Sequence, residues 1–334
     1  ENRGNTTLEL EWRGPGVDAW EIVPASAFVG TPQPLDVEPQ LVALYEFEKV
    51  EVTPRLISRW PFDRLTSTNQ STPIQAAAGD EIDLPHDSRI DSYSSLNGPY
   101  GGANVGQSAQ VATNSTSSNH VMLMPGTTFA GDVMVGPGGD PDRVVRVTGS
   151  AELTGQKRNL LELIDVSDPA DPDDELYPRA RSDWEDEETE REIGEDDTET
   201  YLACRDWEIE DSVITIRGDV NINVEDDFEM EDSQILLAEG ATLRLYCGGI
   251  AYVRDSEINP DSSRTADFTF INYGSGHDQD MRLYAGTVIA GAIRSADDVE
   301  FQAGATLYGT VFAEDDLKEL HGRSRGGPSR DGAM

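Results

Sequence analysis

The sequence predicts an all-β protein whose main part is a parallel β-helix, or β-solenoid, with an N-terminal β-rich region before it. Three observations predict this class. A phrase rich in Asp and Ser recurs about every twenty residues in the C-terminal half. A second phrase, a Gly followed by small and β-branched residues, recurs beside it, and the runs between the phrases alternate apolar and polar residues as short strands do.

The Asp–Ser phrase is the strongest of these signals. It begins at Asp211-Ser212, Asp232-Ser233 and Asp255-Ser256, so that the copies lie 21 and 23 residues apart. Related acidic copies follow at Asp280, Asp297-Asp298 and Asp315-Asp316. We assign all of them to one corner of a stack of about six coils.

The Gly phrase extends the repeat into the middle of the chain. Its copies begin at Gly126, Gly240, Gly286 and Gly304. Coils of this length, with polar residues at their corners, stack their inward side chains into one continuous core. A β-sandwich also has short alternating strands, but its strands do not normally repeat the same corner residues every twenty positions or so.

Composition divides the chain into five segments. They are an N-terminal β-rich region (1–75), with alternation at 8–12 and 44–52, a first solenoid portion (76–164), an acidic loop or insertion (165–200), the main β-solenoid (201–320) and a flexible tail (321–334). The acidic segment holds 17 acidic residues between 165 and 199, and a short surface helix at Trp184–Ile193 is the alternative within it. We expect residues 315–320 to cap the last coil.

Charge limits the partners of the chain. It has 64 acidic and 25 basic residues, a formal net charge of −39, which repels nucleic acid and anionic membranes and suits a saline environment or a cation-binding surface. No apolar run approaches the ~18 residues needed to span a bilayer, so we expect no membrane insertion by this chain. Cys204 and Cys247 are compatible with one disulfide or with two buried thiols.

Several segments, taken in order, resemble a known family. They are residues 90–102, 111–115, 135–141, 218–224, 284–292 and 303–313. In these segments the chain is similar to PilX-like pilus-assembly-associated envelope proteins with a bactofilin-like β-solenoid domain. The resemblance implies a solenoid carried on a pilin-like anchor, exported to the cell surface and without known catalysis. The chain departs from the family in lacking the anchor helix and in having an acidic stretch where a short proline-rich linker is usual.

We therefore expect a non-catalytic structural or adhesive cell-surface protein that is pilus- or filament-associated. Self-association or binding to pilus and envelope components would follow, and a polysaccharide is a further candidate partner. The alternative is a carbohydrate-active β-helix enzyme, a polysaccharide lyase or hydrolase acting on an anionic polymer. Its acid/base pair would come from Asp297-Asp298 and Asp315-Asp316 on adjacent coils. Corner aspartates more often cap turns, so we assign no catalytic residue.

A single metal site is suggested by the sequence. Asp140 and Asp142, with the backbone carbonyls of the Gly-rich turn before them, could wrap a calcium ion, although a tight polar turn explains the same residues. No phosphate-binding or dinucleotide-binding motif is present, and the histidines lack ligand-like spacing. We expect no other cofactor.

Overall fold

A computed structural model describes residues 74–166, 169, 172–173, 175–180, 182–274 and 279–319, and the backbone of residues 11–12 and 21–22. The chain divides into two units, Glu1–Trp60 and Pro61–Met334. In the first unit, strands β1 (Glu11–Trp12) and β2 (Glu21–Ile22) pair antiparallel. The strand predicted at residues 44–52 lies outside the described residues, as does most of the predicted region 1–75.

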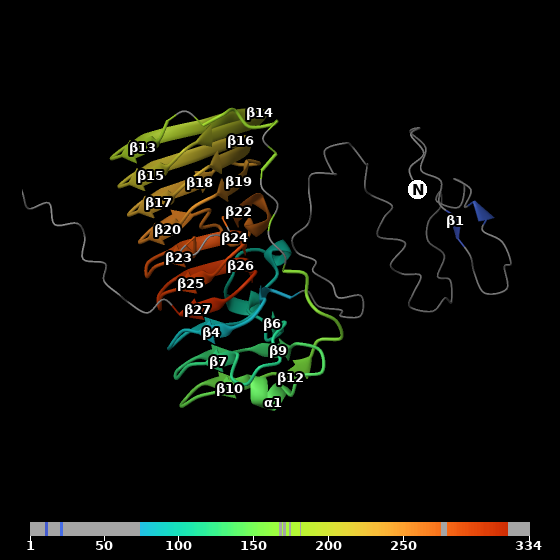
Figure 1. The fold of residues 1–334 in the computed structure, drawn as a ribbon. Helices are drawn as coiled ribbons and strands as arrows, with labels where there is room; N and C mark the ends of the chain where they lie inside the picture. Colours follow the sequence, from blue (N-terminus) through green and yellow to red (C-terminus); the bar gives the residue numbers. More distant parts are fainter. Residues whose placement is uncertain are drawn as a thin grey trace, which may run out of the picture. The chain divides into compact units, whose positions relative to one another are not determined.

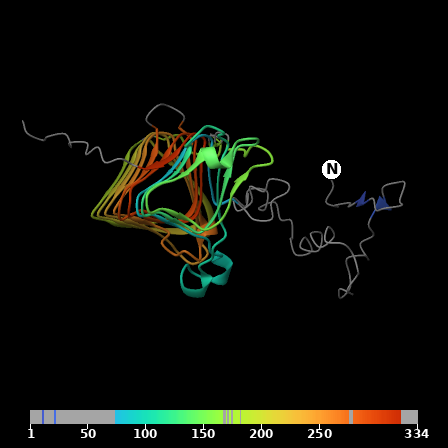
Figure 2. The same cartoon turned by 90° about the horizontal axis from the view of Figure 1, so that it is seen from below.

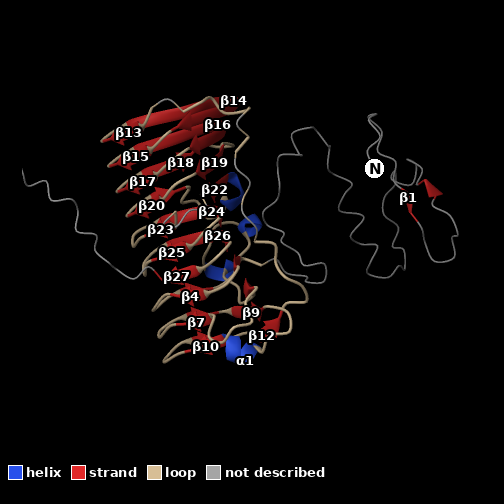
Figure 3. Cartoon of the chain, in the orientation of Figure 1, coloured by secondary structure: helices blue, strands red, loops and turns tan. Residues whose placement is uncertain are grey.

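The described part of the second unit is the predicted parallel β-solenoid (Figures 1 and 3). A ten-stranded sheet contains, in spatial order, β10 (Val145–Val147), β7 (Val121–Leu123), β4 (Ile82–Leu84), β27 (Leu317–Glu319), β25 (Val299–Phe301), β23 (Met281–Leu283), β20 (Ala251–Arg254), β17 (Phe228–Glu231), β15 (Trp207–Glu210) and β13 (Trp184–Glu187). A three-stranded sheet contains β11 (Glu152–Leu153), β8 (Thr128–Phe129) and β5 (Arg89–Ile90).

A twelve-stranded sheet completes the coils. It contains β12 (Lys157–Asn159), β9 (Gly131–Val135), β6 (Ala109–Thr113), β3 (Ala76–Ala78), β26 (Thr306–Ala313), β24 (Val288–Ser295), β21 (Glu257–Ile258), β18 (Gln234–Leu237), β16 (Val213–Val224), β19 (Thr242–Cys247), β22 (Phe268–Asn272) and β14 (Glu190–Cys204). Short helices lie in the loops: η4 (Ser95–Asn97), η5 (Gly102–Asn104), α1 (Pro141–Val144) and η6 (Thr265–Asp267). Among the described residues, no helix is long and apolar enough to cross a membrane.

Long strands bend so that one strand covers two faces of a coil. Strand β16 pairs with β18 through its first half and with β19 through its second half. The bend falls at Gly218, where φ is +69° and an added Cβ would lie 2.1 Å from the carbonyl oxygen of Glu195. Only glycine accepts both conditions without strain. Viewed along the axis, the coils superpose in a triangular outline (Figure 2).

Inward-facing side chains stack in columns and form one core. In one column Trp184, Trp207 and Phe228 follow in register, with ring centroids 5.4 Å apart for the first pair and 5.6 Å for the second. Trp207 and Phe228 are fully buried. Alternate residues of each strand enter such columns, which is why the sequence shows period-two alternation.

The spatial order of the coils differs from their order in the sequence. Starting from β13, the coils run along the axis from residue 184 to 319 and then continue from residue 76 to 159 (Figure 1). We call residues 74–159 the N-terminal arm, residues 182–319 the C-terminal arm and residues 160–180 the strap between them. The sequence predicts coils in both arms but does not reveal this permuted order.

The two arms meet at a non-covalent seam. There β26 pairs with β3, and β27 pairs with β4 through the single register pair Leu317 and Ile82. The backbone N–H of Asp80 donates to the carbonyl oxygen of Asp315 at 2.9 Å, and that of Leu317 donates to Glu81 at 2.9 Å. On the third face of the coils, which carries the three-stranded sheet, no described strands pair across the seam, because β5 pairs only with β8.

The three Asp–Ser phrases align along one corner, as the repeat predicts, because β15, β17 and β20 are in register. Their aspartates have φ values of +49°, +48° and +45°, in the left-handed region that Asp tolerates better than most residues. The serines that follow are buried. The N–H of Ser212 donates to Ser233 Oγ at 2.9 Å, and the N–H of Ser233 donates to Ser256 Oγ at 3.0 Å. The phrase therefore builds a hydrogen-bonded ladder.

The assignment of all copies to one corner is wrong. The acidic pairs 297–298 and 315–316 precede β25 and β27 and stack, with Asp280, at a different corner from the Asp–Ser phrases. The glycines also divide, since Gly286 lies at the Asp–Ser corner and Gly240 lies before β19. Asp and Gly suit turns of several kinds, so their recurrence marks corners without distinguishing them.

The predicted acidic loop 165–200 is wrong in its second half, where β13 and β14 form the first coil of the C-terminal arm. Strands also replace the alternative helix at Trp184–Ile193. All the acidic residues of this coil except Asp186 are exposed, and the neighbouring coil satisfies the backbone, so their charge does not prevent strand formation. The predicted cap at 315–320 is wrong as well, because β27 has a paired strand on both sides.

Described residues of the strap pack on the outer face of the twelve-stranded sheet. Its first residues join a second apolar cluster that covers the seam strands, made of Ile74, Ala77, Ala112, Met134, Leu160, Ile164, Val166 and Phe312. Further along, the ring of Tyr177 makes edge-to-face contacts with Tyr201 and Tyr246. The described strap residues thus contact both arms.

Cys204 and Cys247 are two buried free thiols, so the alternative of one disulfide between them is not observed. They belong to one inward column but lie two coils apart, with Val224 in register between them. Burial raises the pKa of each thiol to about 12. We therefore expect both thiols to be unreactive in the folded chain.

Candidate functional site

An acidic corner lies where four neighbouring strands of the ten-stranded sheet begin. Strands β23, β25, β27 and β4 are in register through Met281, Val299, Leu317 and Ile82. The turns that lead into these strands carry Asp280, Asp297, Asp298, Asp315, Asp316 and Asp80. Because each turn occupies the same place in its coil, the carboxylates stack along the axis.

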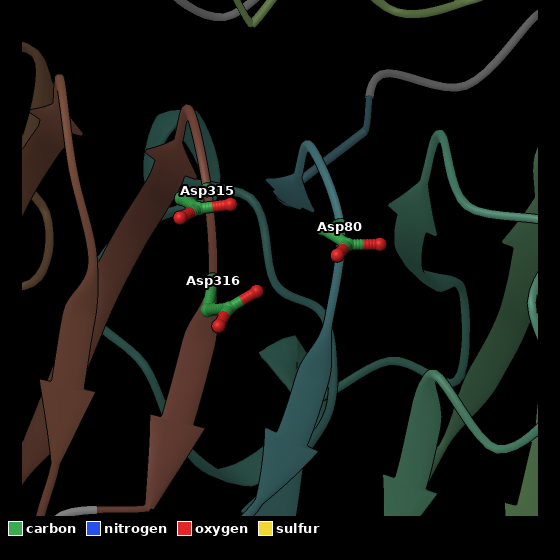
Figure 4. Close-up of side chains that lie close together, drawn as sticks. All are labelled: Asp80, Asp315 and Asp316. Carbon is green, nitrogen blue, oxygen red and sulfur yellow. The ribbon is translucent and has the colours of Figure 1, made fainter.

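One group of carboxylates straddles the seam. Asp80, Asp315 and Asp316 each offer an oxygen, and these oxygens all lie within 4.8 Å of one another. Figure 4 shows the three side chains gathered at the turns before β27 and β4, so that two come from the C-terminal arm and one from the N-terminal arm. The backbone N–H of Glu81 donates to Asp316 Oδ1 at 2.9 Å, a further link across the seam.

A second group lies one coil away and is more buried. Its oxygens, also within 4.8 Å, come from Asp280, Asp297 and Asp298. Two cations approach this group. Arg282 Nη2 lies 2.7 Å from Asp280 Oδ2, and its Nε lies 3.0 Å from Glu300 Oε2. Lys318 pairs with Asp298. These cations offset part of the negative charge of the second group.

The corner holds carboxyl groups that bind protons unusually well. Burial, together with the charges of Asp298 and Asp315, raises the pKa of Asp316 to about 6, although the Glu81 N–H and Lys318 act in the opposite direction. Burial also raises the pKa of Asp315, again with help from neighbouring carboxylates. Ionising the whole corner at neutral pH therefore costs free energy.

Two kinds of chemistry are open to such a corner. Carboxylate oxygens are the ligands that Ca²⁺ accepts, and Asp80, Asp315 and Asp316 could supply part of its coordination shell of six to eight oxygens. A carboxyl group with a pKa near 6 can also give or take a proton near neutral pH. The two uses compete, because a bound cation lowers the pKa of its ligands.

The residues predicted for calcium lie elsewhere, beside the last coil of the N-terminal arm. Asp140 accepts a hydrogen bond from the N–H of Asp142 at 3.1 Å and caps helix α1. Asp142 forms an ion pair with Lys157 at 3.2 Å. The turn thus has a structural role, and a calcium ion held by Asp140 and Asp142 stays a prediction.

The sequence anticipated part of the acidic corner. The predicted stacking of residues 297–298 on residues 315–316 is confirmed by the register of Val299 with Leu317. Asp80, which belongs to the other arm, was not predicted. Its segment Asp80-Glu81-Ile82 does repeat the pattern of two acids before an apolar residue. Because of the permuted order, however, the sequence does not indicate which coils lie next to it.

His120 is the residue beside this corner that most resembles part of a catalytic relay. Its Nδ1 lies 2.8 Å from Asp80 Oδ1 and 3.0 Å from Ser115 Oγ. A Ser–His–Asp relay needs the two partners on opposite ring nitrogens. Here both partners contact the same nitrogen, so this arrangement does not activate Ser115.

Comparison with known proteins gives one likeness. Residues 164–319 match the family described as a domain of unknown function (DUF7305). The matched segment takes in the C-terminal arm and ends at Glu319, the last residue of the seam strand β27. Neither the curated proteins nor the solved structures gave a match. The likeness covers slightly less than half of the chain and carries no activity with it.

Proposed function

We propose that the chain is a non-catalytic structural or adhesive protein of the cell surface that associates with pili or other filaments. The observation that carries this proposal is the solenoid itself. Parallel hydrogen-bond ladders run from β10 to β13 around one continuous core, and such stacks form stiff supports that present rows of side chains. The similarity of the sequence to PilX-like envelope proteins points to the same role.

The outward face also suits this role. Glu208 and Glu229 stand in register on neighbouring coils, and Glu185 continues the row on β13. Rows of like charge keep a β-rich surface from pairing with unrelated strands. Their repulsion also favours solubility, and salt relieves its destabilising effect on the stacked coils.

Surface location and filament binding can be tested on cells that produce the chain. We expect protease added outside whole cells to degrade the protein, and we expect the intact protein to sediment with filaments sheared from the surface. A cytosolic enzyme serves as the control for cell leakage. Full protection from external protease, with no protein in the filament fraction, contradicts the proposal.

The acidic corner favours a second candidate, a carbohydrate-active β-helix enzyme. Asp316, with its pKa raised to about 6, lies near Lys318, and a polysaccharide lyase or hydrolase needs such proton-transfer groups. The test is incubation with pectin, alginate and similar polymers, with and without Ca²⁺. Unsaturated or reducing ends that Asp316→Asn abolishes, and that the exposed control Asp232→Asn retains, would favour the enzyme.

A further inference from the structure

The two ends of the solenoid each expose one strand of both main sheets. Strands β10 and β12 lie at one end, and β13 and β14 lie at the other. Among the described strands, each of these four is paired on one side only. Since both arms wind in the same direction, β10 of one copy placed against β13 of a second copy would continue the sheet in the parallel sense.

The end coils carry opposite charge. Residues 182–204, the coil of β13 and β14, contain eleven acidic residues and one basic residue, and all the acids except Asp186 are exposed. Residues 141–159, the coil of β10 and β12, contain four basic and two acidic residues. We call these coils the acidic end and the basic end.

We propose that the basic end of one copy docks on the acidic end of a second copy, so that the chain assembles head to tail. This deepens the structural role proposed above and rests on it, in that it names the chain itself as a partner in the filament. Two acidic ends repel each other, and two basic ends gain nothing from contact. Opposite charge therefore selects the polar arrangement.

Charged side chains occupy inward positions at both ends of the core, which limits the kind of contact that docking can make. At the acidic end the inward positions of Asp186 and Arg191 hold an ion pair of 3.0 Å. At the basic end Lys157 occupies an inward position and pairs with Asp142 at 3.2 Å. Inward charges of this kind discourage indiscriminate strand addition. Docking therefore depends on the outward charges and is reversible.

The basic end also offers some apolar area. A shallow hollow of about 550 Å³ is lined by Asp142, Val147, Leu153, Gly155, Gln156 and Lys157. Val147 is 40% exposed, although in the next coil its register partner Leu123 is fully buried. Covering this area adds to the attraction between ends.

The dependence on salt concentration distinguishes this end-to-end contact from hydrophobic aggregation. At low ionic strength the net charge of −39 keeps copies apart over long distances. At roughly 0.1 M salt the Debye length is about 10 Å, so long-range repulsion is screened while contacts between ends persist. At about 1 M salt the end contacts are screened as well. Association should therefore rise and then fall with salt, whereas hydrophobic aggregation only rises.

Sedimentation velocity of the purified full chain tests the proposal. We expect the average mass to pass through a maximum near 0.1 M salt. The basic-end variant Arg146→Glu with Arg158→Glu should stay monomeric throughout. The control variant Arg89→Glu with Arg244→Glu makes the same change of charge on β5 and β19, within the stack, and should behave as the unmodified chain does.

A mixing experiment identifies the two surfaces. The acidic-end variant Glu185→Lys with Glu187→Lys should also be monomeric alone, and mixing it with the basic-end variant should restore one-to-one complexes. A chain that is monomeric at every salt concentration, or a basic-end variant that associates normally, overturns the inference. Either result leaves the surface-location experiment unaffected, so the two proposals fail separately.

Discussion

At the scale of single residues, two glycines at bends of the coils distinguish the cost of backbone strain from the cost of a steric clash. Gly218 has φ +69° and meets the Glu195 carbonyl oxygen 2.1 Å from an added Cβ, whereas Gly240 has φ +77° and nothing within 4 Å. Gly240→Ala should cost about 1 kcal/mol of unfolding free energy from backbone strain alone. Gly218→Ala should cost about 3 kcal/mol, because the clash adds to the strain. Urea denaturation measures both values, and equal losses would contradict the role of the close approach.

Asp316 gives a second prediction, on the pH dependence of stability. Its folded pKa of about 6 exceeds the ordinary value, so the folded chain binds the proton more tightly than the unfolded chain does. Stability therefore increases as the pH falls from about 7 to 4, and the ionised carboxylate destabilises the fold above that window. Asp316→Asn should raise the unfolding free energy at pH 7 by about 1 kcal/mol, allowing for solvent screening, and should flatten the pH dependence.

The control for Asp316 is Asp232→Asn. Asp232 is exposed at the Asp–Ser corner, and Asn also tolerates its φ of +48°. The two substitutions remove the same charge from the chain. If both give the same thermal stability profile between pH 4 and 7, then the net charge and not the acidic corner controls the pH dependence.

At the scale of elements, the sequence predicts what is local and repeated. The Asp–Ser ladder could be predicted because each copy contains its own turn residue and its own buried hydroxyl, 21 and 23 residues from the next. Strand β14 could not, because its outward glutamates dominate the composition while its few inward residues, such as Ile193, carry the packing. The composition of this strand reflects mainly its solvent-exposed side chains, whereas the fold depends on the side chains that enter the core.

The seam could not be predicted either, for a topological reason. Parallel pairing of β26 with β3 joins residues that are more than two hundred positions apart in the sequence. No repeat phrase indicates which coils are neighbours in space. The acidic group of Asp80, Asp315 and Asp316 depends entirely on that pairing. The sequence therefore predicted Asp315 and Asp316 as candidate site residues but could not predict that Asp80 lies beside them.

The seam should also be the least protected junction within the stack. It has one register pair between β27 and β4, three carboxylates beside it and no strand pairing on the third face among the described residues. Amides of Asp80 and Leu317 should exchange hydrogen faster than the amide of Phe228, which bonds to Ile250 at 2.9 Å within the C-terminal arm. Equal protection at the three amides would show that the seam opens only with global unfolding.

At the scale of the whole solenoid, the strap makes the permuted order feasible. Ten strands at a spacing of about 4.8 Å span about 43 Å from β10 to β13. The chain between the last residue of β12 and the first of β13 can reach about 80 Å when fully extended. The strap is thus long enough to return along the stack, and its apolar first half also covers the seam.

Cutting the strap tests whether the seam joins the two arms without a covalent link. A protease site inserted after Asp173 would separate the N-terminal arm from the C-terminal arm on cleavage, and a matched site inserted after Asp261 would cut within the C-terminal arm. We expect the strap-cut chain to elute as one particle, because two sheets and the apolar cluster around Phe312 still cross the seam. Its unfolding should then become concentration-dependent, since two fragments must reassociate. Fragments that part in buffer alone would show that the covalent strap, and not the seam, holds the solenoid together.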